Sequence, residues 1–308
     1  MTRAQDRPRH VRIATRASRL ALWQADYVRA RLEALGARVT LVEVATQGDR
    51  DARPFAQLGG VGVFTKAVQD ALISGQADVA VHSFKDLPGM PAPGLEVAAV
   101  PPRADPRDVL VVRPGAFDGA APVVPLRHGV RVGTSAVRRR RLLSAHRPDL
   151  ALQELRGNVP TRLAKLRDGA YDAIVLAAAG LTRLEADVEG LEVAALDPDV
   201  FVPAPAQGAL ALEIRRGEDG LASLLTDLHD VAGYPAVAAE RGLMTMIQGG
   251  CQLALGAHAT RADGRIVLHA WYEGTAASVE HPTGEGAAML AYAALGRPDP
   301  AGTAEVGG

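Results

Sequence analysis

The sequence predicts an α/β protein with two similar lobes and a small C-terminal domain that mixes helix and strand. One observation is that, from residue 11, short apolar runs typical of strands alternate with amphipathic runs typical of helices, in the repeated order strand, turn, helix. A second is that this order begins again near residue 130, where DGAYDAIVLA (168–177) echoes SGQADVAVHS (74–83). A third is an Asp-Gly hairpin signal at residues 263–264, between two apolar runs.

Composition narrows the function classes. The chain has 308 residues, 48% of them hydrophobic, which is enough for two or three domains. Its formal net charge of −1 provides no overall field for nucleic acid or an acidic membrane, so anion binding must be local. Residues 1–10 lack the apolar segment of a signal peptide, and no apolar run reaches about 18 residues. We therefore expect a cytoplasmic protein.

The first lobe follows from the apolar periodicity. Leu20, Trp23, Tyr27 and Leu32 recur at helical spacing, and the helix that they predict ends at Gly36. A second helix is predicted at residues 64–74, after a glycine-rich loop. Strands are predicted at residues 11–14, 39–44 and 79–81.

The second lobe repeats this pattern between two proline-rich stretches, residues 101–106 and 202–205. Its strands are predicted at 130–132, 150–155 and 173–177, and its helices at 137–145 and 160–167. Residues 206–214 alternate small and apolar side chains, and we expect them to return as a strand to the first lobe.

The remainder of the chain predicts a separate small domain. It contains helices at 236–246 and 287–295, strands at 253–259 and 266–272, and a Gly/Pro tail that we expect to be disordered. The predicted division is residues 1–102 with 202–222, residues 103–201, and residues 223–308.

The segment VHSFKDLP (81–88) is the first candidate site. Lys85 and Asp86 follow an apolar strand and precede Pro88, which places them on the loop at the strand's carboxyl end. Ligands of α/β sheets bind at that edge, and a neighbouring cation keeps a carboxylate ionised. The alternative is a solvated surface dipeptide.

Hydroxyl and guanidinium groups gather in the other strand-to-helix turns of both lobes. Such groups at helix N-termini bind anions, so we expect a pocket for a polyanionic small molecule. For the four adjacent arginines, residues 138–141, nucleic-acid binding and a solvated surface helix are the alternatives. Nucleic-acid binding is disfavoured because the four side chains point in all directions and no aromatic residues are interleaved with them. The turns contain Thr15, Arg16, Ser18, Thr134, Ser135, Arg138, Arg139, Arg156 and Arg162.

Cys251 is the lone cysteine, which excludes an internal disulfide and suits a reducing compartment. A lone cysteine is commonly a small buried apolar residue. Here it follows Gly249 and Gly250, where backbone can approach a ligand closely. No histidine lies within five residues of it, and the eight histidines show no metal-ligand spacing. Covalent attachment through the thiol is therefore favoured over Cys-His hydrolysis, and we predict no metal.

Seven motifs in sequence order resemble the porphobilinogen deaminase family, also called hydroxymethylbilane synthases. The resemblance covers about residues 11 to 295. It implies two periplasmic-binding-protein-like lobes joined by a double crossover, and a small α/β domain that carries the cysteine. The motifs are RIATR (12–16), LALWQ (20–24), AVHSFKDLP (80–88), GTS (133–135) with Arg138 and Arg139, LRGNV (155–159), PAQGA (205–209) and GGCQ (249–252).

The resemblance also implies an activity in porphyrin and heme biosynthesis. The family joins four porphobilinogen molecules head to tail, with release of ammonia, into hydroxymethylbilane. The chain grows on a dipyrromethane primer, which Cys251 would hold by a thioether. The implied catalytic residue is Asp86, whose carboxylate would stabilise positive charge on the reacting pyrrole. We expect a monomer that binds neither nucleic acid nor membranes.

The family's binding positions map onto residues of this sequence. Matching the cofactor positions are Lys85, Asp86, Thr134, Ser135, Arg138, Arg139, Arg156 and Arg162. Matching the substrate positions are Arg16, Ser18, Arg156, Arg162 and Arg183. The chain departs from the family at Gln47, Gln57 and Val61, where many members have an arginine or lysines.

A polyanion-binding two-lobe module without catalysis is the alternative function. A secreted binding protein needs a signal peptide, and a transcription regulator needs a helix-turn-helix before the first lobe. The ten residues that precede the first strand supply neither, and neither class needs the motif at Cys251.

Overall fold

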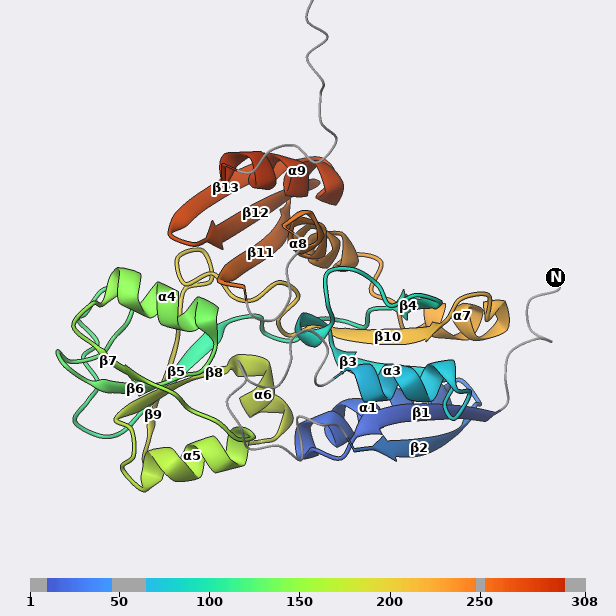
Figure 1. Cartoon of the computed structure of the whole chain (residues 1–308), viewed down its shortest axis with the longest axis horizontal. Helices are drawn as coiled ribbons and strands as arrows, with labels where there is room; N and C mark the ends of the chain where they lie inside the picture. Colours follow the sequence, from blue (N-terminus) through green and yellow to red (C-terminus); the bar gives the residue numbers. More distant parts are fainter. Residues whose placement is uncertain (1–9, 46–64, 248–252, 297–308) are drawn as a thin grey trace, which may run out of the picture. The chain divides into compact units, whose positions relative to one another are not determined.

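The computed structural model describes residues 10–45, 65–247 and 253–296. The chain forms two compact units. Unit 1 is drawn from Met1–Asp105, Ala179–Ala186 and Gln207–Tyr234, and unit 2 from Pro106–Ala178, Asp187–Ala206 and Pro235–Gly308. Each unit has its own mixed sheet covered by helices, which confirms the predicted α/β class (Figure 1).

Unit 1 contains a five-stranded sheet in the order β2-β1-β3-β10-β4. β1 is parallel to β2 and β3, whereas β10 is antiparallel to β3 and β4. The predicted return of the chain to the first lobe is thus confirmed, because β10 joins the sheet after the chain has built the second one. The strands are β1 (His10–Arg16), β2 (Arg38–Val44), β3 (Val79–Ser83), β4 (Leu95–Ala99) and β10 (Leu210–Arg215).

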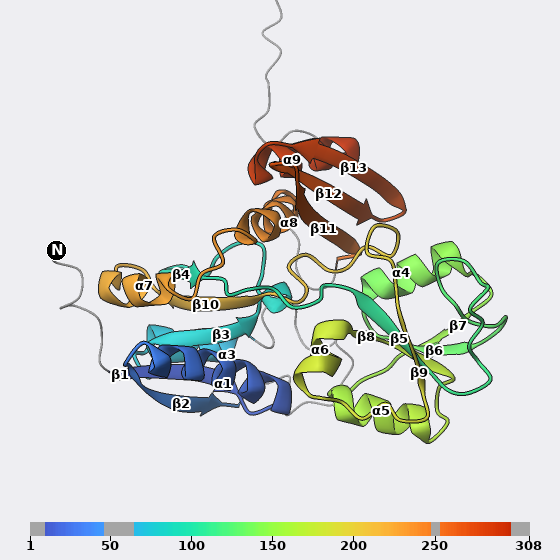
Figure 2. The same cartoon turned by 180° about the vertical axis from the view of Figure 1, so that it is seen from behind.

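Helices lie on both faces of this sheet (Figure 2). Ile13 packs in the core that α1 and α7 share, whereas Ala14, its neighbour along the strand, packs against α3, as the two-residue strand period requires. The helices on its faces are α1 (Arg19–Ala34), α3 (Lys66–Ile73) and α7 (Asp219–Thr226). Unit 1 also contains the short helix η2 (Phe84–Asp86) and, from Ala179 on, α6 (Ala178–Arg183).

The inner face of α1 differs in detail from the predicted one. Trp23 is 36% exposed, whereas the polar Gln24 is 3% exposed. Gln24 is buried because its Nε2 donates a hydrogen bond to Ser83 Oγ at 2.9 Å. Trp23 instead stacks on Tyr27, with ring centroids 5.5 Å apart.

Unit 2 repeats the topology, with the order β7-β6-β8-β5-β9. β6 is parallel to β7 and β8, whereas β5 is antiparallel to β8 and β9. The predicted repeat of strand, turn and helix is therefore confirmed, and each sheet also contains an antiparallel strand between two others, β10 in unit 1 and β5 in unit 2. The strands are β5 (Asp108–Val112), β6 (Arg131–Gly133), β7 (Ala151–Gln153), β8 (Ala173–Ala177) and β9 (Glu192–Ala195).

Two helices cover opposite faces of this sheet in Figure 1, α4 (Val137–His146) and α5 (Val159–Arg167). Leu142 and Leu143 of α4 pack against the buried strand residues. Helix α5 begins after Asn158, whose side chain accepts a hydrogen bond from Thr161 N at 3.0 Å, with Pro160 in the first turn.

The C-terminal part of unit 2 is a three-stranded antiparallel sheet in the order β11-β12-β13. The hairpin turn is as predicted, with φ of 48° at Asp263 and 76° at Gly264. Strands β11 and β12 were predicted, whereas β13, whose residues are exposed or half-buried, was not. The elements are α8 (Tyr234–Met246), β11 (Leu255–Ala262), β12 (Arg265–Tyr272), β13 (Thr275–His281) and α9 (Gly284–Ala294).

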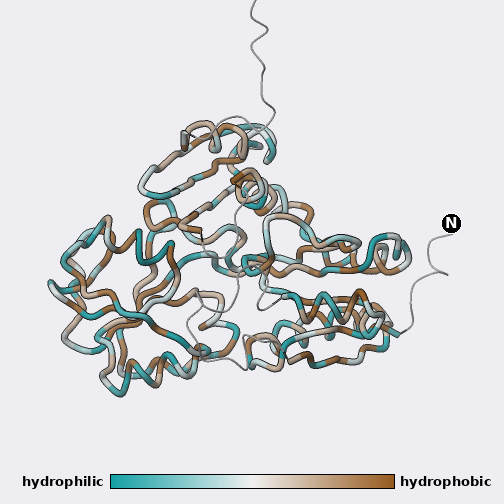
Figure 3. The backbone as a smooth tube through the Cα atoms, in the orientation of Figure 1, coloured by the Kyte–Doolittle hydropathy of each residue, from teal (hydrophilic) through white to brown (hydrophobic). Residues whose placement is uncertain are grey.

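This small sheet packs on both faces. Leu268 of β12 lies in the core with α8 and α9, whereas Trp271 joins the core of the five-stranded sheet in unit 2. Hydrophobic residues run through the strands of both units in Figure 3. None of the helices in the described ranges combines the length and apolar composition that crossing a bilayer requires. The three-domain division at residues 102, 202 and 223 stays a prediction.

Candidate functional site

In unit 1, the loops that follow β1 and β3 build a pocket. The two strands are parallel neighbours, so their carboxyl ends share one edge of the sheet. Arg16 ends β1, and Ser18 caps α1 by accepting a hydrogen bond from Ala21 N at 3.3 Å. The structure thus brings the predicted Arg16, Ser18 and Asp86 to one pocket. Its polar lining consists of Arg16, Ser18, Gln24, Thr65, His82, Ser83 and Asp86.

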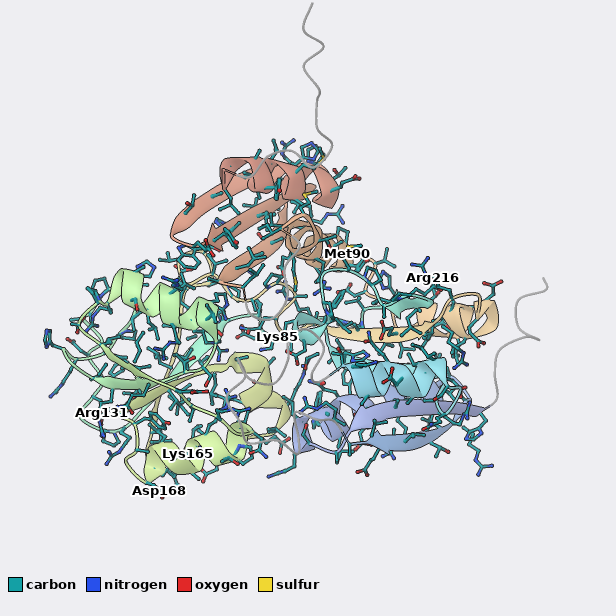
Figure 4. The ribbon with its side chains drawn as sticks, viewed as in Figure 1. Lys85, Met90, Arg131, Lys165, Asp168 and Arg216 are labelled. Atoms are coloured by element: carbon teal, nitrogen blue, oxygen red, sulfur yellow. The ribbon has the colours of Figure 1, made fainter. Side chains whose placement is uncertain are left out.

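Lys85 lies on η2, directly beyond the end of β3 (Figure 4). Its Nζ donates a hydrogen bond to Oε1 of Gln207 at 3.0 Å. Arg103 Nε donates to the backbone oxygen of the same Gln207 at 2.8 Å. Gln207 belongs to the PAQGA motif that leads into β10, so this motif fixes the position of the loop that carries Asp86.

Arg183 ends α6, within unit 1. Its Nη2 donates to Gly208 O at 2.7 Å, and its guanidinium carbon lies 5.6 Å from the ring centroid of Trp23. Burial lowers the pKa of Arg183. Gly208 has φ of 88°, and a Cβ there would collide with Ala104 O, so this position of the motif requires glycine.

In unit 2, the turn after β6 contacts the turn after β7. Ser135 Oγ donates to Leu155 O at 2.6 Å and accepts from Leu155 N at 3.1 Å. Thr134 is 1% exposed, and within the described ranges its Oγ1 is buried without a hydrogen-bond partner. Buried hydroxyl groups normally have a hydrogen-bond partner, so the Thr134 hydroxyl is suited to bond an atom of a bound ligand.

Two neighbouring arginines of α4 share one buried carboxylate. Arg138 and Arg139 are 4% and 6% exposed, and Asp108 is fully buried. Arg138 Nη1 lies 2.7 Å from Asp108 Oδ2, and Arg139 donates to Asp108 Oδ1 through Nε at 3.1 Å and Nη2 at 2.7 Å. Their other contacts are backbone oxygens, Val202 O for Arg138 and Val175 O for Arg139, both at 2.8 Å. Two cations against one carboxylate leave an excess of positive charge.

Arg162 adds to this positive charge. Its Nε donates to Gly157 O at 2.7 Å. Burial, together with the positive charges of Arg139 and Arg156, lowers the pKa of Arg162 to about 10. Part of this lowering comes from repulsion by Arg139 and Arg156, and a bound anion would relieve that repulsion.

Comparison with known proteins decides the family. The family model "Porphobilinogen deaminase, dipyromethane cofactor binding domain" matches residues 11–223. The porphobilinogen deaminase of Syntrophotalea carbinolica is 48% identical over 261 residues, which are 84% of this chain and 81% of the relative. That of Nocardia farcinica is 44% identical over 302 residues, 96% of this chain and 83% of the relative. The chain belongs to the porphobilinogen deaminase family.

Solved structures resemble the chain less closely. The VFT2 domain of Bordetella pertussis BvgS, crystallised as a double mutant, has a TM-score of 0.45 at 18% identity, over 75% of this chain and 91% of that one. An ancestral arginine-binding protein has a TM-score of 0.39 at 15% identity, over 71% of this chain and 92% of that one.

The residues of unit 2 fit the cofactor that the porphobilinogen deaminase family model names. Dipyrromethane consists of two pyrrole rings, each with an acetate and a propionate, so it is a polycarboxylate. Excess guanidinium charge around Arg139, Arg156 and Arg162, and the buried hydroxyl of Thr134, suit such a group. Cys251, the predicted attachment point, lies outside the described residues, as do Gln47, Gln57, Val61 and the tail at 297–308. Among the residues that the structure describes, no group of His, Cys, Asp or Glu side chains is arranged to hold a metal.

Sequence reasoning missed several polar residues of these sites. Gln24 and Thr65 line the pocket of Asp86, and Asp108 pairs with the arginines of α4. A usable signal existed for two more, because His82 and Glu213 interrupt the apolar runs VAVHS and LALEI.

Proposed function

We propose that this chain polymerises porphobilinogen into hydroxymethylbilane, with release of ammonia, and that Asp86 is its catalytic carboxylate. Family membership supports the activity. The observation that carries the residue assignment is the pocket at the ends of β1 and β3, where Asp86 shares the lining with Arg16 and Ser18. An acidic side chain beside cation and hydroxyl groups suits a substrate that has both carboxylates and a reacting ammonium group.

The arginines bind the carboxylates of the substrate and of the growing chain. Each added pyrrole brings an acetate and a propionate, so negative charge accumulates as the chain lengthens. Planar guanidinium groups bind carboxylates with two parallel hydrogen bonds, which orients the ring as well as holding it. In this assignment Arg16 and Arg183 act in unit 1, and Arg156 and Arg162 in unit 2.

Cys251 holds the dipyrromethane through a thioether in this proposal. When bound, the cofactor supplies the pyrrole α-carbon to which the first porphobilinogen is joined. Arg138, Arg139 and the turn at Thr134 and Ser135 hold its carboxylates, at the N-terminal end of α4. These residues act by binding and orienting.

Asp86 stabilises charge and then moves a proton. Positive charge develops on the substrate pyrrole as ammonia leaves, and a fixed carboxylate stabilises that charge without reorganising. The same carboxylate accepts the proton that the α-carbon of the growing chain loses. Lys85 acts as a cation next to Asp86, held by its hydrogen bond to Gln207, and not as a base.

Turnover measured with Asp86→Ala tests this assignment. We expect wild-type protein to release four ammonia molecules for each hydroxymethylbilane, and kcat of the variant to fall about 100- to 1,000-fold. Asp70→Ala is the matched control, because Asp70 is an exposed residue of α3 paired with Lys66. Near-normal turnover in Asp86→Ala would contradict the role of Asp86. Absence of ammonia release by the wild type would contradict the function and favour a polyanion-binding module.

We further propose that the protein acts as a cytoplasmic monomer. A sedimentation-equilibrium mass near the chain mass of 32.2 kDa is expected, with the cofactor added. A mass of twice that value would contradict the monomer.

A further inference from the structure

Unit 1 contains a buried polar trio that the proposed chemistry does not use. It consists of His82 on β3, Glu213 on β10 and Gln69 on α3, which are 5%, 2% and 9% exposed. His82 Nε2 lies 3.1 Å from Glu213 Oε2. Gln69 Nε2 lies 3.0 Å from Glu213 Oε1 and 3.1 Å from Oε2. A carboxylate removed from water is costly unless its oxygens accept hydrogen bonds, which these two side chains provide.

An ionised Glu213 would fix which nitrogen of a neutral His82 carries the proton. An ionised carboxylate only accepts hydrogen bonds, so Gln69 must present its NH₂ group and His82 its Nε2–H. A neutral imidazole protonated at Nε2 has its lone pair on Nδ1. Glu213 therefore orients His82 as a carboxylate orients a catalytic histidine, with Nδ1 as the acceptor.

His82 also lines the pocket that contains Asp86. Glu213 on β10 contacts the imidazole, and Asp86 and Arg16 are the charged residues in the lining of that pocket. One imidazole thus contacts a buried carboxylate and lines the same pocket as the carboxylate that the proposed function makes catalytic.

We propose that His82 relays the proton that Asp86 takes up, and that Glu213 and Gln69 are its positioning residues. This inference rests on the proposed function. The C–N bond of the substrate's protonated aminomethyl group breaks with its electron pair on nitrogen, which releases neutral ammonia within the pocket. The α-carbon of the growing chain forms the new C–C bond and loses its proton to Asp86. That proton passes to Nδ1 of His82 and then to the ammonia, which departs as ammonium, so no further reactant is needed.

Nitrogen NMR of the histidine ring tests the geometry without turnover. Wild-type protein should show His82 protonated at Nε2 in its neutral form. In Glu213→Gln, Gln69 still needs an acceptor and takes the new amide oxygen, which turns the amide NH₂ toward His82. His82 should then carry its proton at Nδ1, where it can no longer accept one. An unchanged Nε2–H form in the variant would overturn the positioning role of Glu213.

Kinetics test the relay itself. We expect His82→Asn to lower kcat about 100-fold and Glu213→Gln at least tenfold, with KM within a factor of about two, because a positioned acid or base contributes 10² or more. The double variant should be no slower than His82→Asn alone, because residues that act as one unit are not additive. His229→Asn is the matched control, since His229 Nδ1 accepts a bond from Val100 N in the same unit, and its kcat should not change.

The outcomes separate this inference from the proposed function. A structural role for the trio predicts lower melting temperatures with kcat unchanged at 25 °C, and that result would overturn the relay. Multiplicative loss of kcat in the double variant would also overturn it. If the wild type made no product, the proposed function would fail instead, and the ring NMR would still report the state of His82.

Discussion

Replacing Asp108 with asparagine should destabilise unit 2 strongly. Asp108 is fully buried and is the carboxylate that Arg138 and Arg139 share, with closest N to O distances of 2.7 Å for each. Asparagine keeps one acceptor oxygen for Arg139 but leaves two adjacent guanidinium charges buried without a negative partner. Removing one partner of a buried ion pair costs about 3 to 5 kcal/mol. A unit of this size loses about 2 to 4 °C of melting temperature per kcal/mol, so we expect a fall of roughly 10 °C.

Thermal unfolding followed by circular dichroism measures this effect. Asp187→Asn is the matched control, because Asp187 pairs with Arg167 in the same unit but is 72% exposed. Exposed pairs contribute about 0 to 1 kcal/mol, so the control should shift by no more than a few degrees. Equal shifts for the two variants would refute the reasoning that burial makes the Asp108 pair important.

Three other predictions concern the binding arginines, acid stability and the PAQGA motif. Arg162→Met should raise KM for porphobilinogen about 10- to 100-fold, because charge-assisted hydrogen bonds contribute about 1.5 to 3 kcal/mol. Arg167→Met, on the same helix, is the control and should leave KM unchanged. An unchanged KM in Arg162→Met would contradict the assignment of Arg162 to carboxylate binding. The hydrogen bond from Arg131 holds the pKa of Asp172 below its usual value, so the ionised carboxyl stabilises the fold near neutral pH. The advantage of the wild type over Asp172→Asn in urea unfolding should then shrink as the pH falls below about 4, and a constant advantage would count against it. Gly208→Ala should cost at least about 1 to 2 kcal/mol in thermal unfolding, since φ is 88° and the new Cβ meets Ala104 O, and an unchanged melting temperature would disprove that conflict.

The sequence predicted the parts of the fold that depend on local pattern. The repeated strand-turn-helix order, the return strand β10 and the Asp-Gly hairpin all appear in the structure. β13 was missed because its exposed and half-buried residues resemble loop composition, and β9 because it has only four residues, most of them exposed. Strand β5 was missed because it follows a proline-rich stretch that indicated a boundary between lobes.

Most of the site features that the sequence did not predict are contacts between residues far apart in the chain. Arg138 and Arg139 were identified as anion-binding residues from their position at a helix start. Their burial against Asp108 could not be inferred, because that partner lies about 30 residues earlier, on strand β5. The same holds for His82 and Glu213, which are 131 residues apart. The Asp108 contacts depend on how α4 packs against β5, and the His82–Glu213 contact depends on how β3 pairs with β10. No local sequence pattern encodes either arrangement.

The intact mass of the purified chain under denaturing conditions tests the central claim most directly. The account predicts a mass above the sequence value by one two-ring pyrrole adduct, lost in the variant Cys251→Ser. A chain purified without cofactor should gain the adduct when it is incubated with porphobilinogen. A bare mass before and after that incubation, or an adduct that persists in Cys251→Ser, would contradict covalent attachment at Cys251.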